Sequence, residues 1–362
     1  MSFWNIYKGK KVLITGDTGF KGSWLAIWLT QLGANVYGYA LPPLSDLDNF
    51  VTTQLNKQIH HLDGDVRDRK KLTNYFNEVQ PDIAFHLAAQ PLVLLSYKEP
   101  VSTFETNLMG VVNFFEAVRA TPSVKVAINI TSDKCYDNKE WVWGYRENDP
   151  MGGKDPYSAS KGCAELITSS YQHSFFKDEG TCLIASGRAG NVIGGGDWAL
   201  DRIVPDYFKA YQKNEKLLLR NPFATRPWQH VLEPLSGYLN LAAKIYIDGK
   251  VYTGGWNFGP EDTTNYSVKE LIDQILKIDS RGGYHIPQNT NKPHEANLLK
   301  LDISKAVNIL NWRPALTFND TVEFTVKGYQ DDLIGNNLFQ KRETQILSYI
   351  SKAVTKGIEW AL

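Results

Sequence analysis

The sequence carries no excess of charge of either sign. Its 39 lysines and arginines balance 39 aspartates and glutamates, so the formal net charge is zero. Nucleic acids and anionic membranes attract proteins mainly through clustered positive charge. The balance therefore favours neither partner, and any polyanion bound by this chain must be small and held by a few local groups.

Cysteine is scarce, and its spacing is uninformative. The chain has three cysteines, Cys135, Cys163 and Cys182, and no CxxC pair. An odd number without disulfide-like or metal-like spacing is typical of a reducing compartment. The histidines, including the His60-His61 pair, also lack metal-ligand spacing. We therefore expect no metal site.

Long hydrophobic runs, internal repeats and low-complexity segments are missing as well. No stretch reaches the roughly 18 apolar residues of a membrane span, and Met1–Lys11 lacks the apolar run of a signal peptide. We expect a cytoplasmic protein without a membrane partner. What is present is a chain of 362 residues, 43% hydrophobic, which suffices for two domains or for one large domain with an added lobe.

Up to about residue 190, short apolar segments alternate with longer amphipathic ones. The predicted strands are Lys11–Thr15, Asn35–Tyr39, Ile59–Leu62, Asp82–Leu87, Lys125–Ile130 and Thr181–Ser186. The predicted helices include Ser23–Leu32, Lys70–Val79, Val101–Ala120 and Tyr157–Phe176. Strands that alternate with helices form βαβ units. The pattern therefore predicts an α/β fold with a parallel, doubly wound sheet of the Rossmann type.

Beyond residue 190 the pattern is looser. Helical stretches recur at Glu233–Ile247, Val268–Leu276 and Ser304–Leu310. We predict a Rossmann domain over residues 1–190, with parts of about 231–260 returning to it. A smaller, interleaved lobe over most of 191–362 is expected to bind the substrate.

The first predicted strand runs directly into a glycine-rich turn. Gly16, Gly19 and Gly22 follow it with GxxGxxG spacing, and a helical pattern begins at Ser23. Such glycines let the backbone approach a pyrophosphate, which the free N–H groups of the helix N-terminus attract. The turn, including Phe20 and Lys21, is therefore predicted to bind a dinucleotide.

Two later segments extend this predicted site. Asp65-Val66 follows the third strand, where Asp65 could accept a hydrogen bond from an adenine amino group. Leu87-Ala88-Ala89 ends the fourth strand, and its small side chains would let a cofactor lie against the backbone. The second strand, however, ends in Tyr39-Ala40-Leu41 and lacks the acidic residue that usually binds the adenosine ribose. These residues leave the choice between NAD and NADP open.

Tyr157 and Lys161 lie four residues apart at the start of a predicted helix. Asp155 suits the N-cap and Pro156 the first helical position. The spacing places both side chains on one helix face. A nearby cation stabilises a phenolate and lowers the tyrosine pKa from about 10. Tyr157 could therefore act as a base toward a hydroxyl group.

This constellation resembles the extended short-chain dehydrogenase/reductase family over nearly the whole chain. The residues that carry the resemblance are Gly16, Gly19, Gly22, Asp65-Val66, Leu87-Ala88-Ala89, Asn107, Tyr157 and Lys161. It implies an NAD-binding Rossmann domain, a nucleotide-sugar lobe and a hydroxyl group near the Tyr–Lys pair, here Ser132. It further implies that Val192 faces the nicotinamide and Asn191 the sugar diphosphate. Arg226, with possible help from Arg220, would bind that diphosphate.

The segment Ser132-Asp133-Lys134 narrows the resemblance. Nucleotide-sugar 4,6-dehydratases carry Thr-Asp-Glu at this strand end, whereas this chain has a lysine in place of the glutamate. Together with Gly19–Trp24 and Trp141–Glu147, the segment is similar to the branch that dehydrates CDP-glucose in deoxysugar biosynthesis. That branch oxidises the sugar at C4, eliminates water across C5–C6 and returns the hydride to C6. The resemblance makes Asp133 the candidate acid and Lys134 the candidate base, although their roles could be reversed.

One position departs from the family. Where many relatives carry arginines after Lys292-Pro293-His294, this chain has Glu295, which could accept hydrogen bonds from ribose hydroxyls. The contacts to the base and ribose are therefore open. The resemblance also implies a homodimer, in which Val101–Ala120 and Tyr157–Phe176 pair as a four-helix bundle, with a tetramer as the alternative.

Two other functions compete with this interpretation. A nucleotide-sugar 4-epimerase, or a dehydratase for another nucleotide, would use the same scaffold, but epimerisation does not need the acid and base of Asp133-Lys134. A cofactor-binding regulator without chemistry would have no need of Tyr157 and Lys161.

Overall fold

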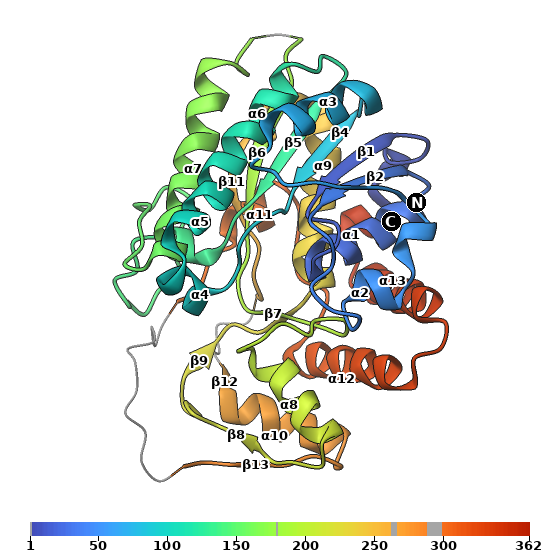
Figure 1. Ribbon diagram of the computed structural model, residues 1–362, viewed down its shortest axis with the longest axis vertical. Helices are drawn as coiled ribbons and strands as arrows, with labels where there is room; N and C mark the ends of the chain where they lie inside the picture. Colours follow the sequence, from blue (N-terminus) through green and yellow to red (C-terminus); the bar gives the residue numbers. More distant parts are fainter. Residues whose placement is uncertain (1, 179, 262–265, 288–298) are drawn as a thin grey trace.

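The centre of the molecule is a seven-stranded, wholly parallel sheet with the order β11-β6-β5-β4-β1-β2-β3. The structure, a computed structural model, describes residues 2–178, 180–261, 266–287 and 299–362 (Figure 1). The strands of the sheet are β1 (Lys11–Thr15), β2 (Asn35–Ala40), β3 (His60–Asp63), β4 (Ile83–His86), β5 (Val126–Ile130), β6 (Leu183–Arg188) and β11 (Gly254–Asn257). The strand order reverses between β1 and β4, and open α/β sheets bind ligands beyond the carboxyl ends of such strands. The predicted Rossmann architecture is confirmed.

One face of the sheet is covered by α3 (Arg69–Val79), α6 (Gly110–Arg119) and α7 (Pro156–Ser174) (Figure 1). Leu72 and Phe76 of α3, Phe114 of α6 and Ile184 of β6 belong to the core on this face. The predicted helix Val101–Ala120 is observed as three consecutive helical segments. These are α5 (Pro100–Phe104), the π-helical η3 (Glu105–Met109) and α6. The short α4 (Val93–Lys98) precedes them.

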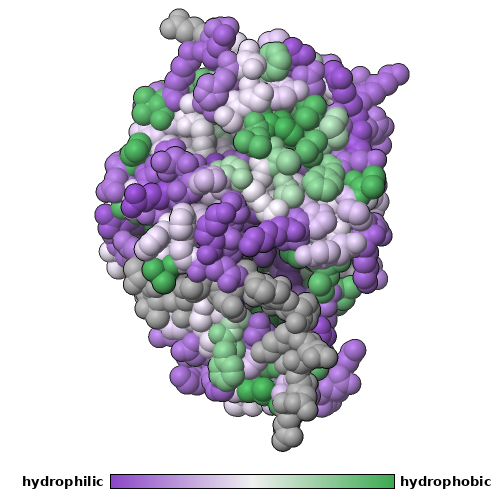
Figure 2. Space-filling view, turned by 90° about the vertical axis from the view of Figure 1, so that its left-hand side faces the viewer, coloured by the Kyte–Doolittle hydropathy of each residue, from purple (hydrophilic) through white to green (hydrophobic). Residues whose placement is uncertain are grey.

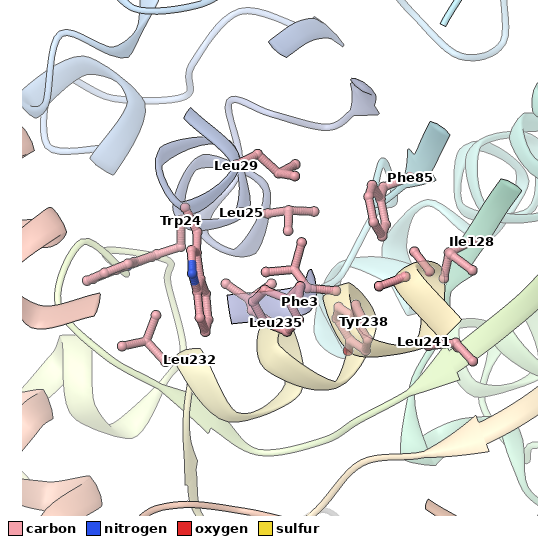
Figure 3. Close-up of a cluster of buried hydrophobic side chains, with 14 of the residues drawn as sticks. Phe3, Trp24, Leu25, Leu29, Phe85, Ile128, Leu232, Leu235, Tyr238 and Leu241 are labelled. Atoms are coloured by element: carbon pink, nitrogen blue, oxygen red, sulfur yellow. The ribbon is translucent and has the colours of Figure 1, made fainter. Parts of the chain in front are cut away.

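The opposite face is covered by α1 (Phe20–Gln31) and α9 (Leu232–Asp248), with α13 (Leu338–Thr355) packed on α1. Figure 3 shows Trp24 and Leu25 of α1 beside Leu232 and Leu235 of α9 in this buried cluster. Residues 22–29 of α1 are all buried. A helix that is buried on every side must be enclosed by other elements, which explains why α13 returns to this layer.

A second, smaller core lies in the lower part of the molecule (Figure 1). Its helices are α8 (Ile203–Gln212), α10 (Val268–Ile278) and α12 (Phe318–Ile334), and its short strands are β8 (Leu217–Leu218), β9 (Thr225–Arg226), β12 (Tyr266–Ser267) and β13 (Tyr284–His285). Phe208 of α8 stacks on Tyr329 of α12 with ring centroids 4.1 Å apart. The pair β7 (Val192–Ile193) and β10 (Gln229–His230) connects this lobe to the sheet.

The remaining short elements complete the chain. They are η1 (Ser2–Asn5), α2 (Asn49–Thr52), η2 (Leu55–Lys57), η4 (Asp133–Cys135), η5 (Gly249–Tyr252), α11 (Ser304–Asn308) and η6 (Glu359–Ala361). The two ends of the chain lie together, because Phe3 stacks on Trp360 at 4.9 Å. Among the described residues, no helix has the length and apolarity needed to cross a membrane.

The sequence predicted six of the seven strands, each with bounds within two residues of those observed. It did not predict β11, α8, α12 or α13. Although α9, β11 and α13 follow residue 190, they pack with the sheet and α1. The division of the chain at residue 190 stays a prediction.

The buried side chain of Arg342 connects α13 with α2 and α12. Arg342 of α13 donates to Asn49 Oδ1 at 2.9 Å and to Gly328 O at 3.3 Å, and it pairs with Asp332 of α12. Asp332 also accepts a hydrogen bond from Gly196 N at 2.7 Å. Burial raises the pKa of Asp332, against the opposing effect of Arg342. The carboxylate therefore depends on the arginine for its charge.

Replacing Arg342 with methionine should lower the free energy of unfolding by about 3–5 kcal/mol, because Asp332 would stay buried without its counter-ion. The matched control is Lys352→Met, which removes a more exposed pair with Asp320 of α12 and should cost less than about 1 kcal/mol. Urea unfolding of both variants measures the difference. Equal losses in the two would contradict this account of the layer contact.

Candidate active site

The three glycines of the first turn have different structural roles. Gly16 adopts φ +82°, and a Cβ there would lie 2.6 Å from Ala88 N, so the turn rests directly on the end of β4. A Cβ on Gly22 would lie 2.0 Å from Gly16 O. Gly19 is exposed, and a Cβ there would meet only Gly16 O, at 3.4 Å. Gly16 and Gly22 are therefore required by the protein's own packing, whereas Gly19 leaves open space in front of the turn.

The open space faces the N-terminus of α1. Gly19 is the N-cap, and it supplies no side chain to bind the first N–H groups of the helix. These groups have no acceptor within a helix, and together with the helix dipole they attract an anion. Phe20 and Lys21 in the first turn are half-buried, as are Leu87, Ala88 and Ala89 at the adjacent end of β4. The predicted dinucleotide residues of these two segments thus lie together.

The residues after β3 form a fixed turn. The carboxylate of Asp65 binds the Arg67 guanidinium at 2.9 and 2.6 Å, and this interaction holds the pKa of Asp65 below its usual range. Val66 is buried, and its carbonyl accepts a hydrogen bond from Asn113 at 2.9 Å. In this structure Asp65 therefore already has a partner, and the expected contact to adenine stays a prediction.

A buried acid in the first turn was not predicted. Asp17 is fully buried, and its Oδ2 lies 2.6 Å from His61 Nδ1 on β3. Burial raises the pKa of Asp17. Burial alone would lower the pKa of His61, but the hydrogen bond and charge of Asp17 outweigh it and raise that pKa. The pair connects the turn to β3 across Gly38, where a Cβ would lie 2.1 Å from the Asp17 carboxylate.

Tyr157, Ser132 and Lys161 meet beyond the end of β5. Asp155 caps α7 by accepting a hydrogen bond from Ser158 N at 2.9 Å, so the helix begins where the sequence predicted. The Ser132 side chain lies close enough to the Tyr157 hydroxyl group to lower its pKa. Lys161 is one turn further on and donates to Ile130 O at 3.5 Å. The structure thus brings the predicted oxidation residues together on β5 and α7.

Burial disfavours charge on both members of the Tyr–Lys pair. It raises the pKa of Tyr157 to about 12, although the side chain of Ser132 and the charge of Arg202 act in the opposite direction. Burial also lowers the pKa of Lys161 to about 8. The phenol is therefore protonated at neutral pH, and it can lose its proton only when positive charge or a proton acceptor is supplied nearby.

Two further cations lie in the same region. Lys21 of the first turn is surrounded by the charges of Arg202, Asp133 and Lys161, and burial with the two cations lowers its pKa to about 8. Arg202, just before α8, pairs with Asp197 at 2.8 Å. Lys21 was predicted only as part of the dinucleotide turn, and Arg202 was missed. The sequence signal that could have identified Arg202 is its position shortly after the glycine-rich segment 194–196.

Asp133 is buried directly beside the oxidation residues. Ser132 Oγ donates to Asp133 Oδ1 at 2.8 Å, and Asn191 Nδ2 lies 3.5 Å from Oδ2. A Cβ on Gly190 would lie 2.0 Å from the same carboxylate, so glycine is required there. Asn191 adopts a left-handed conformation with φ +52°. Lys134 follows in η4 and is half-buried, and its N–H donates to Ser132 Oγ at 3.2 Å.

A buried ion pair between Glu165 and Arg188 fixes the positions of α7, β6 and the segment around Ser132. Glu165 of α7 accepts hydrogen bonds from Arg188 at 2.7 Å, from Ser186 at 2.7 Å and from Thr131. Burial would raise the pKa of Glu165, but Arg188 outweighs this effect and keeps it below its usual value. Arg188 also donates to Tyr136 at 2.6 Å. The pair therefore connects α7 with β6 and with both sides of Ser132.

Asn107, in the π-helical turn η3, fixes the end of β4 against α7. Its Oδ1 accepts from Gln90 N at 2.8 Å, and its Nδ2 donates to Ser160 Oγ at 2.9 Å. Ser160 in turn donates to the carbonyl of Tyr157 at 2.7 Å. This residue therefore couples the predicted cofactor edge to the catalytic helix.

The predicted site residues of the smaller lobe have fewer contacts with the Tyr157 cluster. Val192 lies in β7 and is half-buried. Arg226 lies in β9 and donates to Thr225 O at 2.8 Å. Arg220 is exposed. Its charge opposes the burial that raises the pKa of Asp206 in α8. Among the described residues, no contact joins Arg220 to the Tyr157 cluster, and Glu295 lies outside them. Within the same residues, no group of side chains has the composition of a metal site.

A doubly wound sheet with a glycine turn at its switch point, and with a Tyr–Lys pair beside a serine, defines the class of extended short-chain dehydrogenases/reductases. Comparison with known proteins narrows this class. Residues 13–325 match the family model described as GDP-mannose 4,6 dehydratase. The chain belongs to this family of nucleotide-sugar dehydratases and related enzymes.

Individual relatives agree with this assignment. The chain is 47% identical over 351 residues to CDP-glucose 4,6-dehydratase from Salmonella typhimurium, with 96% of this chain and 98% of the relative covered. Among solved structures, epimerase Mth375 from Methanothermobacter thermautotrophicus has a TM-score of 0.78, 23% identity and coverage of 94% and 96%. The dTDP-glucose 4,6-dehydratase from Bacillus anthracis, solved in complex with NAD, has a TM-score of 0.72, 20% identity and coverage of 89% and 97%. The two structures establish a shared fold.

The different roles of the turn glycines can be tested directly. Gly19→Val should fold with near-normal stability, because the added side chain enters open space, and should weaken dinucleotide binding by about tenfold or more, or about 1.4 kcal/mol. Gly22→Ala should instead lower the thermal unfolding temperature, because its Cβ meets Gly16 O. Fluorescence titration with NAD and NADP, beside thermal unfolding, measures both effects. Unchanged dinucleotide affinity in folded Gly19→Val would place the cofactor elsewhere.

Proposed function

We propose that this chain is an NAD-dependent 4,6-dehydratase that converts CDP-glucose to CDP-4-dehydro-6-deoxyglucose and water. The observation that carries the proposal is the buried carboxyl group of Asp133, which accepts a hydrogen bond from Ser132 Oγ at 2.8 Å beside Tyr157. A 4-epimerase needs Tyr157 and Ser132 and has no use for the Asp133 carboxyl group. The identity to a CDP-glucose 4,6-dehydratase over nearly the full chain supports the choice of substrate.

The residues of the first turn fit a dinucleotide. The space in front of Gly19 and the uncapped N-terminus of α1 would accept the pyrophosphate, with Gly16, Phe20, Lys21 and Gly22 around it. Asp65 and Val66 would lie near the adenine, and Leu87, Ala88, Ala89 and Val192 near the remainder of the cofactor. When bound, NAD accepts the hydride from C4 of the sugar and later returns it to C6, so that no external reductant is consumed.

The oxidation residues would act on the sugar 4-hydroxyl. Tyr157, as the phenolate, takes its proton, and Lys161 stabilises that phenolate. Ser132 turns its one O–H from Asp133 toward the same sugar oxygen. Because burial raises the pKa of Tyr157 to about 12, the phenol must lose its own proton before it can accept that of the sugar, and the ammonium group of Lys161 favours this loss. The product of this step is a 4-ketone, which acidifies the proton at C5.

Elimination would use the neighbouring pair. Lys134 removes the C5 proton, and Asp133 donates a proton to the departing 6-hydroxyl, so that the C6–O bond breaks and a C5–C6 double bond forms. Asn191, 3.5 Å from Asp133, keeps the carboxyl group oriented. On the diphosphate side, Arg226 and Asn191 are the proposed contacts, with Arg220 assisting and Glu295 accepting from the ribose.

We further propose that two copies of the chain pair through α4, α5, η3 and α7. Large hydrophobic side chains on these helices are 45–69% exposed: Leu94, Tyr97, Val101, Met109 and Leu166. Figure 2, which views the side of the molecule that carries α7, shows hydrophobic side chains gathered on the upper part of this face. Such a patch is typical of a protein–protein interface.

The proposed division of labour predicts that oxidation and elimination can be separated. Asp133→Asn and Lys134→Met should still reduce bound NAD when CDP-glucose is added, so that the absorbance of reduced nicotinamide rises. Formation of the 6-deoxy product should fall by about 10²-fold or more, the usual effect of removing a general acid or base. Single-turnover absorbance with product analysis measures both steps.

Tyr157→Phe is the matched control, because it should bind NAD and lose both steps. A structural ion pair between Asp133 and Lys134 would instead weaken folding and affect both steps equally. If both variants complete the cycle at ordinary rates, the dehydratase proposal is wrong and the epimerase alternative replaces it.

A further inference from the structure

A small cavity adjoins the Asp133 carboxyl group. Its volume is about 20 Å³, and its lining includes Asp133, Gly190, Gln229, Gly259 and Lys300. A cavity needs roughly 10–15 Å³ to hold one water molecule, together with two to four polar partners. The cavity therefore has room for a single hydroxyl group or water molecule and little more.

Gln229 brings an unused acceptor to this cavity. The side chain is 1% exposed, and its Nε2 donates to Gly190 O at 3.0 Å and to Phe258 O at 3.1 Å. Two carbonyl acceptors fix the orientation of the amide, since only the NH₂ end can donate to them. Its Oε1 is left buried without a hydrogen-bond partner among the described residues. A buried acceptor without a partner costs free energy, which points to a ligand that completes it.

Lys300 lines the cavity from a segment distant in sequence. Its backbone is fixed, because Tyr145 N donates to Lys300 O at 2.9 Å and Asp302 N donates to Tyr145 O at 2.8 Å. The ammonium group is a donor without acceptor capacity. Asp133, Gln229 and Lys300 thus bring an acid, an amide with an unpartnered acceptor and a cationic side chain to the lining of one cavity, beside the apolar Pro227, Pro260 and Leu301.

We propose that this cavity holds the oxygen of the sugar's 6-hydroxyl group and then the water molecule that this oxygen becomes. The inference rests on the proposed dehydration. As the C5 proton leaves, its electron pair forms the C5–C6 double bond, the C6–O bond breaks, and the proton of Asp133 completes the water. Lys300 donates a hydrogen bond to the departing oxygen, and Gln229 Oε1 accepts one from it.

Lys300 and Gln229 would therefore act on elimination and not on oxidation. Negative charge grows on the 6-oxygen only while the C6–O bond is breaking, and preorganised donors stabilise charge where it develops. The first hydride transfer leaves this oxygen unchanged. A change at the cavity should accordingly slow the second step alone, which a general loss of structure would not do.

Two variants test the proposal by different means. Lys300→Met removes the donor and keeps most of the length of the side chain. Gly259→Ala adds a methyl group to the cavity wall, and its Cβ would meet Ile303 and Leu301 at the ordinary distances of 3.6 and 3.8 Å, so it should fold. The controls are Lys213→Met, an exposed lysine of the lobe, and Gly283→Ala, whose Cβ would meet Lys216 at 3.6 Å.

Each protein is loaded with NAD, mixed with CDP-glucose and followed through one turnover. Both test variants should reduce NAD at the rate of the wild type, within about twofold, and form the 6-deoxy product about tenfold more slowly or worse. The controls should match the wild type in both steps. Test variants that eliminate water at the control rate, or that slow both steps equally, would overturn the inference. A wild-type protein that forms no 6-deoxy product would overturn the proposed function instead.

Discussion

The buried ion pair between Glu165 and Arg188 is the constraint on which the site depends. Glu165 lies one helical turn beyond Lys161, and Arg188 ends β6, so their contact locks the catalytic helix to the sheet. Thr131 and Ser186 bind the same carboxylate, and Tyr136 binds the arginine. Breaking such a pair would leave a buried charge uncompensated. The position of Ser132, between Thr131 and Asp133, therefore follows from a buried interaction behind it.

Burial sets the protonation state of the titratable groups in the site. It raises the pKa of Tyr157 and lowers those of Lys161 and Lys21, so all three groups are shifted toward their neutral forms. The whole chain is neutral, yet Lys21, Lys161 and Arg202 converge on one region. In the proposed function, the diphosphate of the substrate and the pyrophosphate of the cofactor would supply the complementary charge. The net charge of zero describes the whole chain, whereas these three cations lie close together in the site.

Local sequence patterns predicted much of the fold and part of the site. The glycine turn, the Asp155 cap and the Tyr157–Lys161 spacing are short-range signals, and the structure brings the corresponding side chains together. The strand β11 escaped prediction because half of its residues are glycine and it pairs with β6, about 70 residues earlier. The Asp17–His61 pair, Arg202 and the cavity formed by Gln229 and Lys300 depend on contacts between distant segments, which one-dimensional periodicity does not contain.

The most direct test of the central claim is the fate of the hydrogen at C4. CDP-glucose labelled with deuterium at C4 should yield a 4-keto-6-deoxy product that carries the deuterium at C6, because the same bound cofactor accepts the hydride and returns it. Mass spectrometry and NMR of the product measure this transfer. In a parallel reaction, dTDP-glucose labelled in the same way should react more slowly than CDP-glucose. Deuterium that is lost to solvent or found again at C4, with an intact 6-hydroxyl group, would contradict the account.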